Sequence, residues 1–99
     1  MRLELVRSGG FAGLELRTTL DTAELPAAEA RAIEAAIRQS DVPELERRSP
    51  LPGRGADRFE YDLTVTDEGQ DHRLVIGETE VPAPLKPVLR RLEEQPTRR

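Results

Sequence analysis

Near the start of the chain, two runs of alternating apolar and polar residues, 2–7 and 14–21, flank a glycine-rich stretch. The stretch consists of Arg7, Ser8, Gly9, Gly10, Phe11, Ala12 and Gly13. Alternation with a period of two is typical of strands, and glycine adopts the positive φ values that tight connections need. The pattern therefore predicts an antiparallel hairpin with one covered face and one wet face.

Phe11 lies in the predicted connection, although the chain contains only two Phe and one Tyr. Burial of an aromatic ring is strongly favourable, so a ring in a glycine-rich connection needs an explanation. The residues alone leave two explanations open. Either Phe11 folds back and caps the sheet, or it is presented to a partner.

The residues after this hairpin predict a helix over 26–39. Asp21 and Thr22, where the second strand ends, are both favoured N-cap residues, and Pro26 is expected at the first helical position. The segment is rich in strong helix formers. Its apolar stripe consists of Ala30, Ile33, Ala36 and Ile37. Such a stripe predicts packing against the sheet.

Residues 41–56 differ in composition, with three prolines, two glycines and a cluster of arginines. Because proline and glycine disfavour regular elements, we expect an irregular loop over this range. A structureless connection of this length is uncommon inside a domain and is usually either functional or disordered. The residues alone leave both interpretations open.

A second hairpin and a second helix complete the chain. Residues 57–66 alternate, and one face carries Phe59, Tyr61, Leu63 and Val65. Two aromatic residues on this inner face predict a central strand. Residues 67–70 read as a turn, and residues 71–77 as the returning strand. Residues 84–92 predict a helix, because their apolar positions follow an i, i+3, i+4, i+7 spacing.

The predicted order is β-β-α-β-β-α, an α+β domain with a four-stranded antiparallel sheet and two helices packed on one face. Two strand orders are open, 1-2-3-4 and 2-1-3-4, depending on the side to which the 41–56 loop returns the chain. At 99 residues we expect a single domain over 1–95, with a frayed tail over 96–99.

Few residues support catalysis or metal binding. The chain has no cysteine, and its one histidine, His72, is on the inward-facing side of a predicted strand, where a structural role is expected. Ser8 and Ser49 are not in a nucleophile motif, and the glycine-rich stretch is not a phosphate-binding loop. The carboxylates Asp57, Glu60 and Asp62 are expected on a solvated face, paired with Arg58 and Arg73. We expect a binding protein without a cofactor.

Charge and hydropathy narrow the range of partners. The net charge is −4 with interspersed signs, whereas nucleic-acid binders usually show a clustered basic face. No apolar run approaches the length of a membrane span. We therefore expect a cytoplasmic protein that binds neither nucleic acid nor membrane.

Three segments together resemble the emfourin family of protealysin inhibitors. They are Arg7-Ser8-Gly9-Gly10-Phe11-Ala12-Gly13, Asp57-Arg58-Phe59-Glu60-Tyr61-Asp62-Leu63-Thr64-Val65 and Val81-Pro82-Ala83-Pro84-Leu85. The resemblance covers nearly the whole chain, in the same order. It implies a small cytoplasmic inhibitor of thermolysin-like (protealysin-like) zinc metallopeptidases, expected to be a monomer when free.

The resemblance also implies a site. The glycine-rich stretch, Arg7 to Gly13, would block the active-site cleft of the protease, with Phe11 in the apolar pocket of a protease that cleaves before large apolar residues. The alternative is a non-inhibitory adaptor domain that binds through the 41–56 loop and the C-terminal helix.

Overall fold

The computed structural model describes residues 1–9, 15–48 and 59–94. The tip of the first hairpin, residues 49–56 of the predicted loop and the predicted tail 96–99 lie outside the described residues. The strands are β1 (Arg2–Gly9), β2 (Leu16–Asp21), β3 (Phe59–Asp67) and β4 (Gln70–Gly77). The α-helices are α1 (Ala27–Gln39), α2 (Val42–Arg47) and α3 (Lys86–Glu93), and two 3-10 helices are η1 (Thr22–Glu24) and η2 (Ala83–Leu85).

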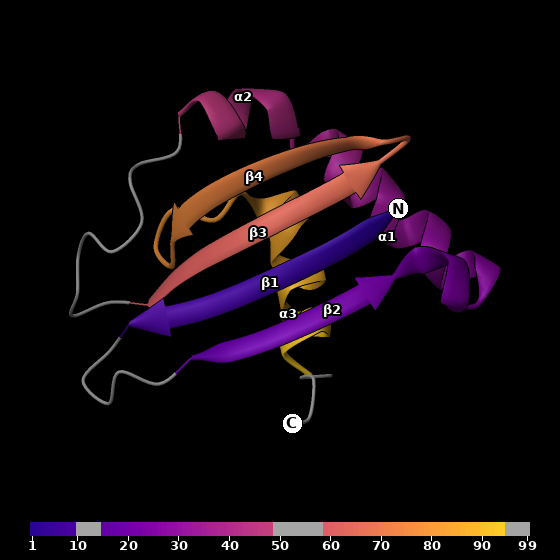
Figure 1. Cartoon of the computed structure of the whole chain (residues 1–99), viewed down its shortest axis with the longest axis horizontal. Coiled ribbons are helices and arrows are strands. Elements are labelled where there is room, and N and C mark those ends of the chain that lie inside the picture. The colour runs from indigo at the N-terminus through magenta and orange to yellow at the C-terminus, as the bar shows by residue number, and fades with distance from the viewer. Residues whose placement is uncertain (10–14, 49–58, 95–99) are drawn as a thin grey trace.

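The four strands form one antiparallel sheet in the order β2-β1-β3-β4 (Figure 1). The second of the two predicted orders is therefore the observed one, and β3 is central, as its aromatic residues predict. In the register between β1 and β3, Leu5 is opposite Leu63 and Gly9 is opposite Phe59. The α+β class predicted from the sequence is confirmed.

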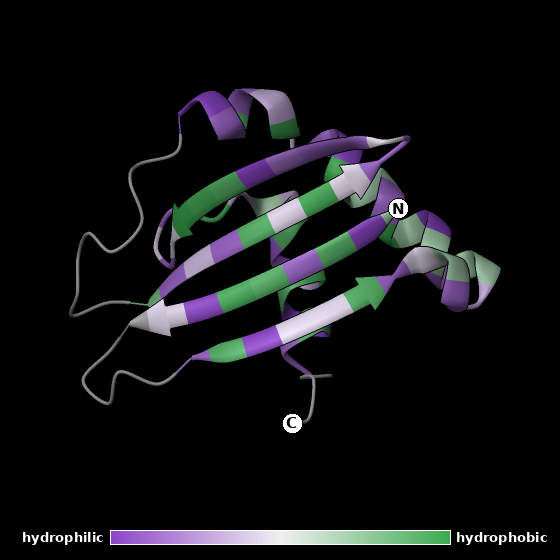
Figure 2. Ribbon diagram, in the orientation of Figure 1, coloured by the Kyte–Doolittle hydropathy of each residue, from purple (hydrophilic) through white to green (hydrophobic). Residues whose placement is uncertain are grey.

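The core lies between the sheet and helices α1 and α3, which cover one of its faces (Figure 1). Hydrophobic and hydrophilic residues alternate along β1 and β3 (Figure 2), so each strand turns its apolar side chains to the helices. The fully buried leucines are Leu3, Leu5, Leu63, Leu74, Leu85 and Leu92. None of the described helices is both long and apolar enough to cross a membrane.

The prediction of an irregular loop over 41–56 is wrong for its first part, which folds into α2 beside the edge strand β4. Pro43 is in the first turn, where an amide hydrogen has no helical partner. Val42 is buried and Leu45 packs against the core. These contacts stabilise a helix that six residues would not form alone. The described residues therefore contain three α-helices rather than two.

Two helix starts differ from the predictions. Pro26 is the N-cap of α1 rather than its first residue, and the helix begins at Ala27. Asp21 caps η1 instead, because its Oδ1 accepts a hydrogen bond from the Ala23 N–H at 3.0 Å. The last helix begins with the 3-10 turn η2 and continues as α3 from Lys86.

Candidate functional site

The seven residues predicted to bind a protease divide into two groups. Arg7, Ser8 and Gly9 lie in β1, which is longer than the alternating pattern predicts. The residues outside the described part are Gly10, Phe11, Ala12 and Gly13. The choice between capping and presentation for Phe11 therefore stays a prediction.

β1 ends at Gly9 and β3 begins at Phe59, and these two residues are paired across the two strands. Phe59 also binds the segment after β4. Its carbonyl oxygen accepts from the Glu78 N–H at 3.1 Å, and its own N–H donates to Glu78 Oε1 at 2.8 Å. Three segments of the chain thus meet where the predicted site begins.

Four side chains gather at this end of the sheet, and we call Arg7, Phe59, Tyr61 and Glu93 the hairpin-base cluster. Arg7 Nη1 donates to Glu93 Oε2 at 2.7 Å, and the Tyr61 hydroxyl donates to the same oxygen at 3.2 Å. The Arg7 guanidinium carbon lies 4.7 Å from the centroid of the Phe59 ring, within the range of a cation–π interaction. The cluster joins β1, β3 and α3.

The sequence explains why Arg7 reaches α3. Arg7 is in phase with Leu3 and Leu5, so its side chain projects to the helix-covered face. A charge on that face needs a partner, and Glu93 in the last turn of α3 supplies it. The inward phase of Arg7 was the sequence signal for such a partner, but nothing in the pattern identified Glu93.

The two aromatic members of the cluster differ in burial. Phe59 is in phase with Leu63, on the predicted inner face of β3, but it is 38% exposed, so the helices do not cover its ring. It is the first residue of β3, and the guanidinium of Arg7 lies over its ring. Burial, and then the nearby charge of Glu93, raise the pKa of the Tyr61 hydroxyl above its usual value. Tyr61 therefore stays a neutral donor at physiological pH.

A groove of about 200 Å³ adjoins the hairpin-base cluster. Its lining residues are Tyr61, Glu78, Val81, Lys86, Leu89, Arg90 and Glu93. Side chains of both charges line it together with two aliphatic side chains, so the groove lacks the continuous apolar wall that is typical of a small-molecule site.

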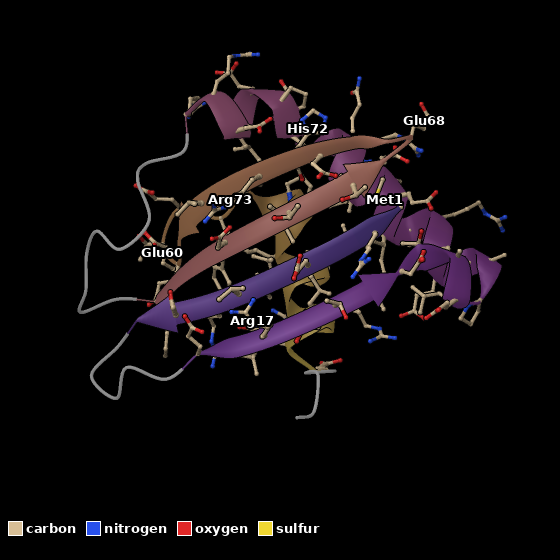
Figure 3. All side chains as sticks on the ribbon, in the orientation of Figure 1. Met1, Arg17, Glu60, Glu68, His72 and Arg73 are labelled. Atoms are coloured by element: carbon tan, nitrogen blue, oxygen red, sulfur yellow. The ribbon has the colours of Figure 1, made fainter. Side chains whose placement is uncertain are left out.

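His72 lies near the other end of the sheet, on β4 beside α2 (Figure 3). Its Nδ1 is 2.9 Å from Glu46 Oε1, while Glu46 Oε2 accepts from the Arg73 N–H at 3.2 Å. These two contacts, the His72 contact first, lower the pKa of Glu46. The histidine thus fastens α2 to the sheet edge, which agrees with the structural role expected for it.

The carboxylates predicted to lie on a solvated face of the sheet differ in exposure and in their partners. Arg73 makes a bidentate contact with Asp62, at 2.9 Å from Nε and 2.6 Å from Nη2, which confirms this predicted pair. Glu60 is only 9% exposed, so its predicted solvation is wrong. Asp57 and Arg58 lie outside the described residues. Within the described ranges, no group of three or more His, Asp or Glu side chains is arranged to hold a metal ion.

A family model described as Emfourin matches residues 5–93 of the chain. The match extends from the middle of β1 to the end of α3, and it includes the glycine-rich stretch and all four residues of the hairpin-base cluster. Searches of the curated proteins and of the solved structures give no match.

Proposed function

The chain belongs to the emfourin family of metallopeptidase inhibitors, and we propose that it inhibits a thermolysin-like zinc metallopeptidase by blocking the active-site cleft with residues 7–13. The observation that carries the proposal is the family match itself, whose bounds, residues 5–93, include the glycine-rich stretch and α3. In this proposal the inhibitor acts as a cytoplasmic monomer and brings no cofactor of its own.

The mechanism that we propose is occupation of the cleft in the manner of a substrate. Phe11 enters the apolar pocket that takes the residue after the scissile bond. Glycines on both sides of Phe11 let the backbone approach the cleft edge and form β-like hydrogen bonds with it. An anchor of this kind often carries much of the binding energy of an interface.

The attachment of the stretch to the sheet supports the same proposal. Gly9 is the last residue of β1 and is paired with Phe59 on β3. A segment that starts from a fixed strand loses less conformational freedom on binding than a free peptide does. A fixed start would also slow cleavage of the inhibitor, since the bound chain does not relax away from its initial geometry.

The test is titration of a thermolysin-like protease with the purified protein and two variants. Phe11→Ala should raise the inhibition constant at least tenfold, equivalent to about 1.4 kcal/mol, with no change in melting temperature. Phe11→Leu is the matched control, because a large apolar side chain remains and inhibition should be largely retained.

Two outcomes would contradict the proposal. If the unmodified protein fails to inhibit at micromolar excess, an adaptor that binds through residues 41–56 and α3 becomes the better explanation. If Phe11→Ala loses stability while its folded fraction inhibits normally, Phe11 caps the sheet and is not the inserted residue.

A further inference from the structure

Within the 7–13 stretch proposed to block the cleft, we propose that Arg7 is the exception: a positioning residue, which acts through Glu93 and Phe59 to fix the end of β1, rather than a residue that touches the protease. The inference rests on the proposed function only for its effect on inhibition. The effect on the sheet itself is a property of the free protein.

The direction of the Arg7 side chain is the first argument. Arg7 shares its face of β1 with Leu3 and Leu5, which are completely buried. Its side chain is 32% exposed, and its guanidinium is directed to α3, where Glu93 accepts its hydrogen bond at 2.7 Å. A partner that approaches the hairpin tip meets a guanidinium that is already engaged on the inner face of the sheet.

The arrangement of the cluster is the second argument. A single oxygen, Glu93 Oε2, accepts from both Arg7 and Tyr61, while the guanidinium lies over the ring of Phe59. Charge-assisted hydrogen bonds are stronger than neutral ones, and this pair is partly shielded from solvent, with side-chain exposures of 32% and 24%. One guanidinium therefore ties β1 to β3 and to the C-terminal helix.

The position of Arg7 along β1 is the third argument. Ser8 projects to the open face of the sheet, and Gly9, the next inward position, has no side chain. Arg7 is therefore the last side chain of β1 that reaches the helix layer, two residues before the chain leaves the sheet. Without it, the support that the described residues give the strand end would be its backbone pairing with β3.

The consequence is a link between α3 and inhibition. If Glu93 releases Arg7, the end of β1 frays more often, and the protease must order it again on binding. Such ordering lowers affinity without removing any contact between the two proteins. Glu93 thus influences inhibition although it lies in the last turn of a helix, 86 residues along the chain from Arg7.

The test compares Glu93→Gln with Glu29→Gln. The control removes the carboxylate of another partly exposed ion pair, between Glu29 on α1 and Arg91 on α3, and leaves the hairpin-base cluster intact. Amide hydrogen exchange of Ser8, which is paired with Glu60 on β3, is measured on the free proteins, with Leu3 and Leu5 as internal references. Melting temperatures and inhibition constants are measured alongside.

We expect both variants to lower the melting temperature by a similar small amount. Only Glu93→Gln should accelerate exchange at Ser8, by about fivefold, the upper range for a partly exposed pair, and raise the inhibition constant by a similar factor. Unchanged exchange at this amide, or equal acceleration in both variants, would overturn the inference whether or not the protein inhibits. Accelerated exchange in a protein that never inhibits would leave the positioning role standing and reject the proposed function.

Variants of Arg7 separate positioning from direct contact. If Arg7 acts through Glu93, the effects of Arg7→Ala and Glu93→Gln on the inhibition constant are not additive, since both break the same link. Arg7→Lys should restore only part of the effect, because an ammonium lacks the planar group that lies over Phe59. Additive effects, with unchanged exchange in Arg7→Ala, would instead show that Arg7 contacts the protease.

Discussion

The hydroxyl group of Thr18 gives the sharpest prediction about stability. Thr18 is on the inner face of β2, opposite Leu5, and only 1% of its surface is exposed. Within the described part of the chain, its Oγ1 has no hydrogen-bond partner. The folded protein therefore bears the desolvation of a polar group without the compensating bond that most buried hydroxyl groups make.

Thr18→Val should stabilise the protein. A buried, unsatisfied hydroxyl costs about 1–3 kcal/mol, and valine replaces it with a methyl group on the same branched carbon. Taking the lower part of this range, we expect the free energy of unfolding to rise by about 1 kcal/mol. For a domain of this size, that gain raises the melting temperature by about 4–8 °C. Urea unfolding measured by circular dichroism gives the free energy directly.

Thr22→Val is the matched control, because the same substitution at similar burial should have the opposite sign. Thr22 is 2% exposed. Its hydroxyl donates to Glu34 Oε2 at 2.7 Å, and the Met1 carbonyl oxygen is a second acceptor, 3.1 Å from Oγ1. Loss of this bond to a charged group should lower the free energy of unfolding by about 1.5–3 kcal/mol. Equal destabilisation by both variants would refute the reasoning, since the Thr18 hydroxyl would then be worth as much as a bonded one.

Two further predictions concern helix α2, which lies beside the edge strand β4, and the turn between β3 and β4. The pKa of Glu46 is below its ordinary value of 4.5, chiefly because of its hydrogen bond with His72 and then that with the Arg73 amide. The Glu46 carboxyl therefore binds a proton less readily in the folded protein than in the unfolded chain. Its contribution to the free energy of unfolding is complete above about pH 4.5 and is lost as the pH falls. Glu46→Gln should reduce the acid sensitivity of the melting temperature as the pH falls below about 4.5, and an unchanged profile would contradict this assignment. In the turn between β3 and β4, Glu68 and Gly69 have φ values of 53° and 79°, and Asn-Gly is the preferred pair for such a turn. Glu68→Asn should therefore raise the free energy of unfolding, measured by urea titration, by up to about 1 kcal/mol. A lower free energy of unfolding would show that the Glu68 side chain makes a favourable contact.

The strands were predictable because their side chains alternate, but the order of the strands was not. Alternation assigns Leu3, Leu5 and Leu63 to one face of the sheet, and it says nothing about which strand lies beside which. Both 1-2-3-4 and 2-1-3-4 bury the same side chains. The observed order depends on the return of the chain from α2 to Phe59, a connection that no hydrophobic period marks.

The short helix α2 shows a different limit. Proline, arginine and glycine dominate the composition of residues 41–56 and predict no regular element. The helix forms because Val42 and Leu45 reach the core and because Glu46 binds two groups on β4. Contacts of this kind join residues 26 or more positions apart, and a local pattern does not contain them.

The candidate site was predictable only in part, because a local pattern does not contain contacts between residues that are distant in sequence. The glycine-rich stretch is visible as a local composition, whereas its support is not local. Arg7 was grouped with the residues that follow it, since sequence order suggests a single loop. Its partners in the structure, Glu93 and Tyr61, are on α3 and β3. Only the inward phase of Arg7 pointed to a role inside the fold.

The register of the sheet decides which neighbour supports the start of the glycine-rich stretch. Among the described residues, the pairing of β1 with β2 ends at Arg7 and Leu16, whereas its pairing with β3 continues through Ser8 to Gly9. The last two residues of β1 are therefore still paired with β3, next to the aromatic ring over which the Arg7 guanidinium lies. A hairpin usually obtains its rigidity from its own two strands. Here β3 and α3, which are distant in sequence, also support the end of β1, so the start of the glycine-rich stretch depends on contacts beyond its own hairpin.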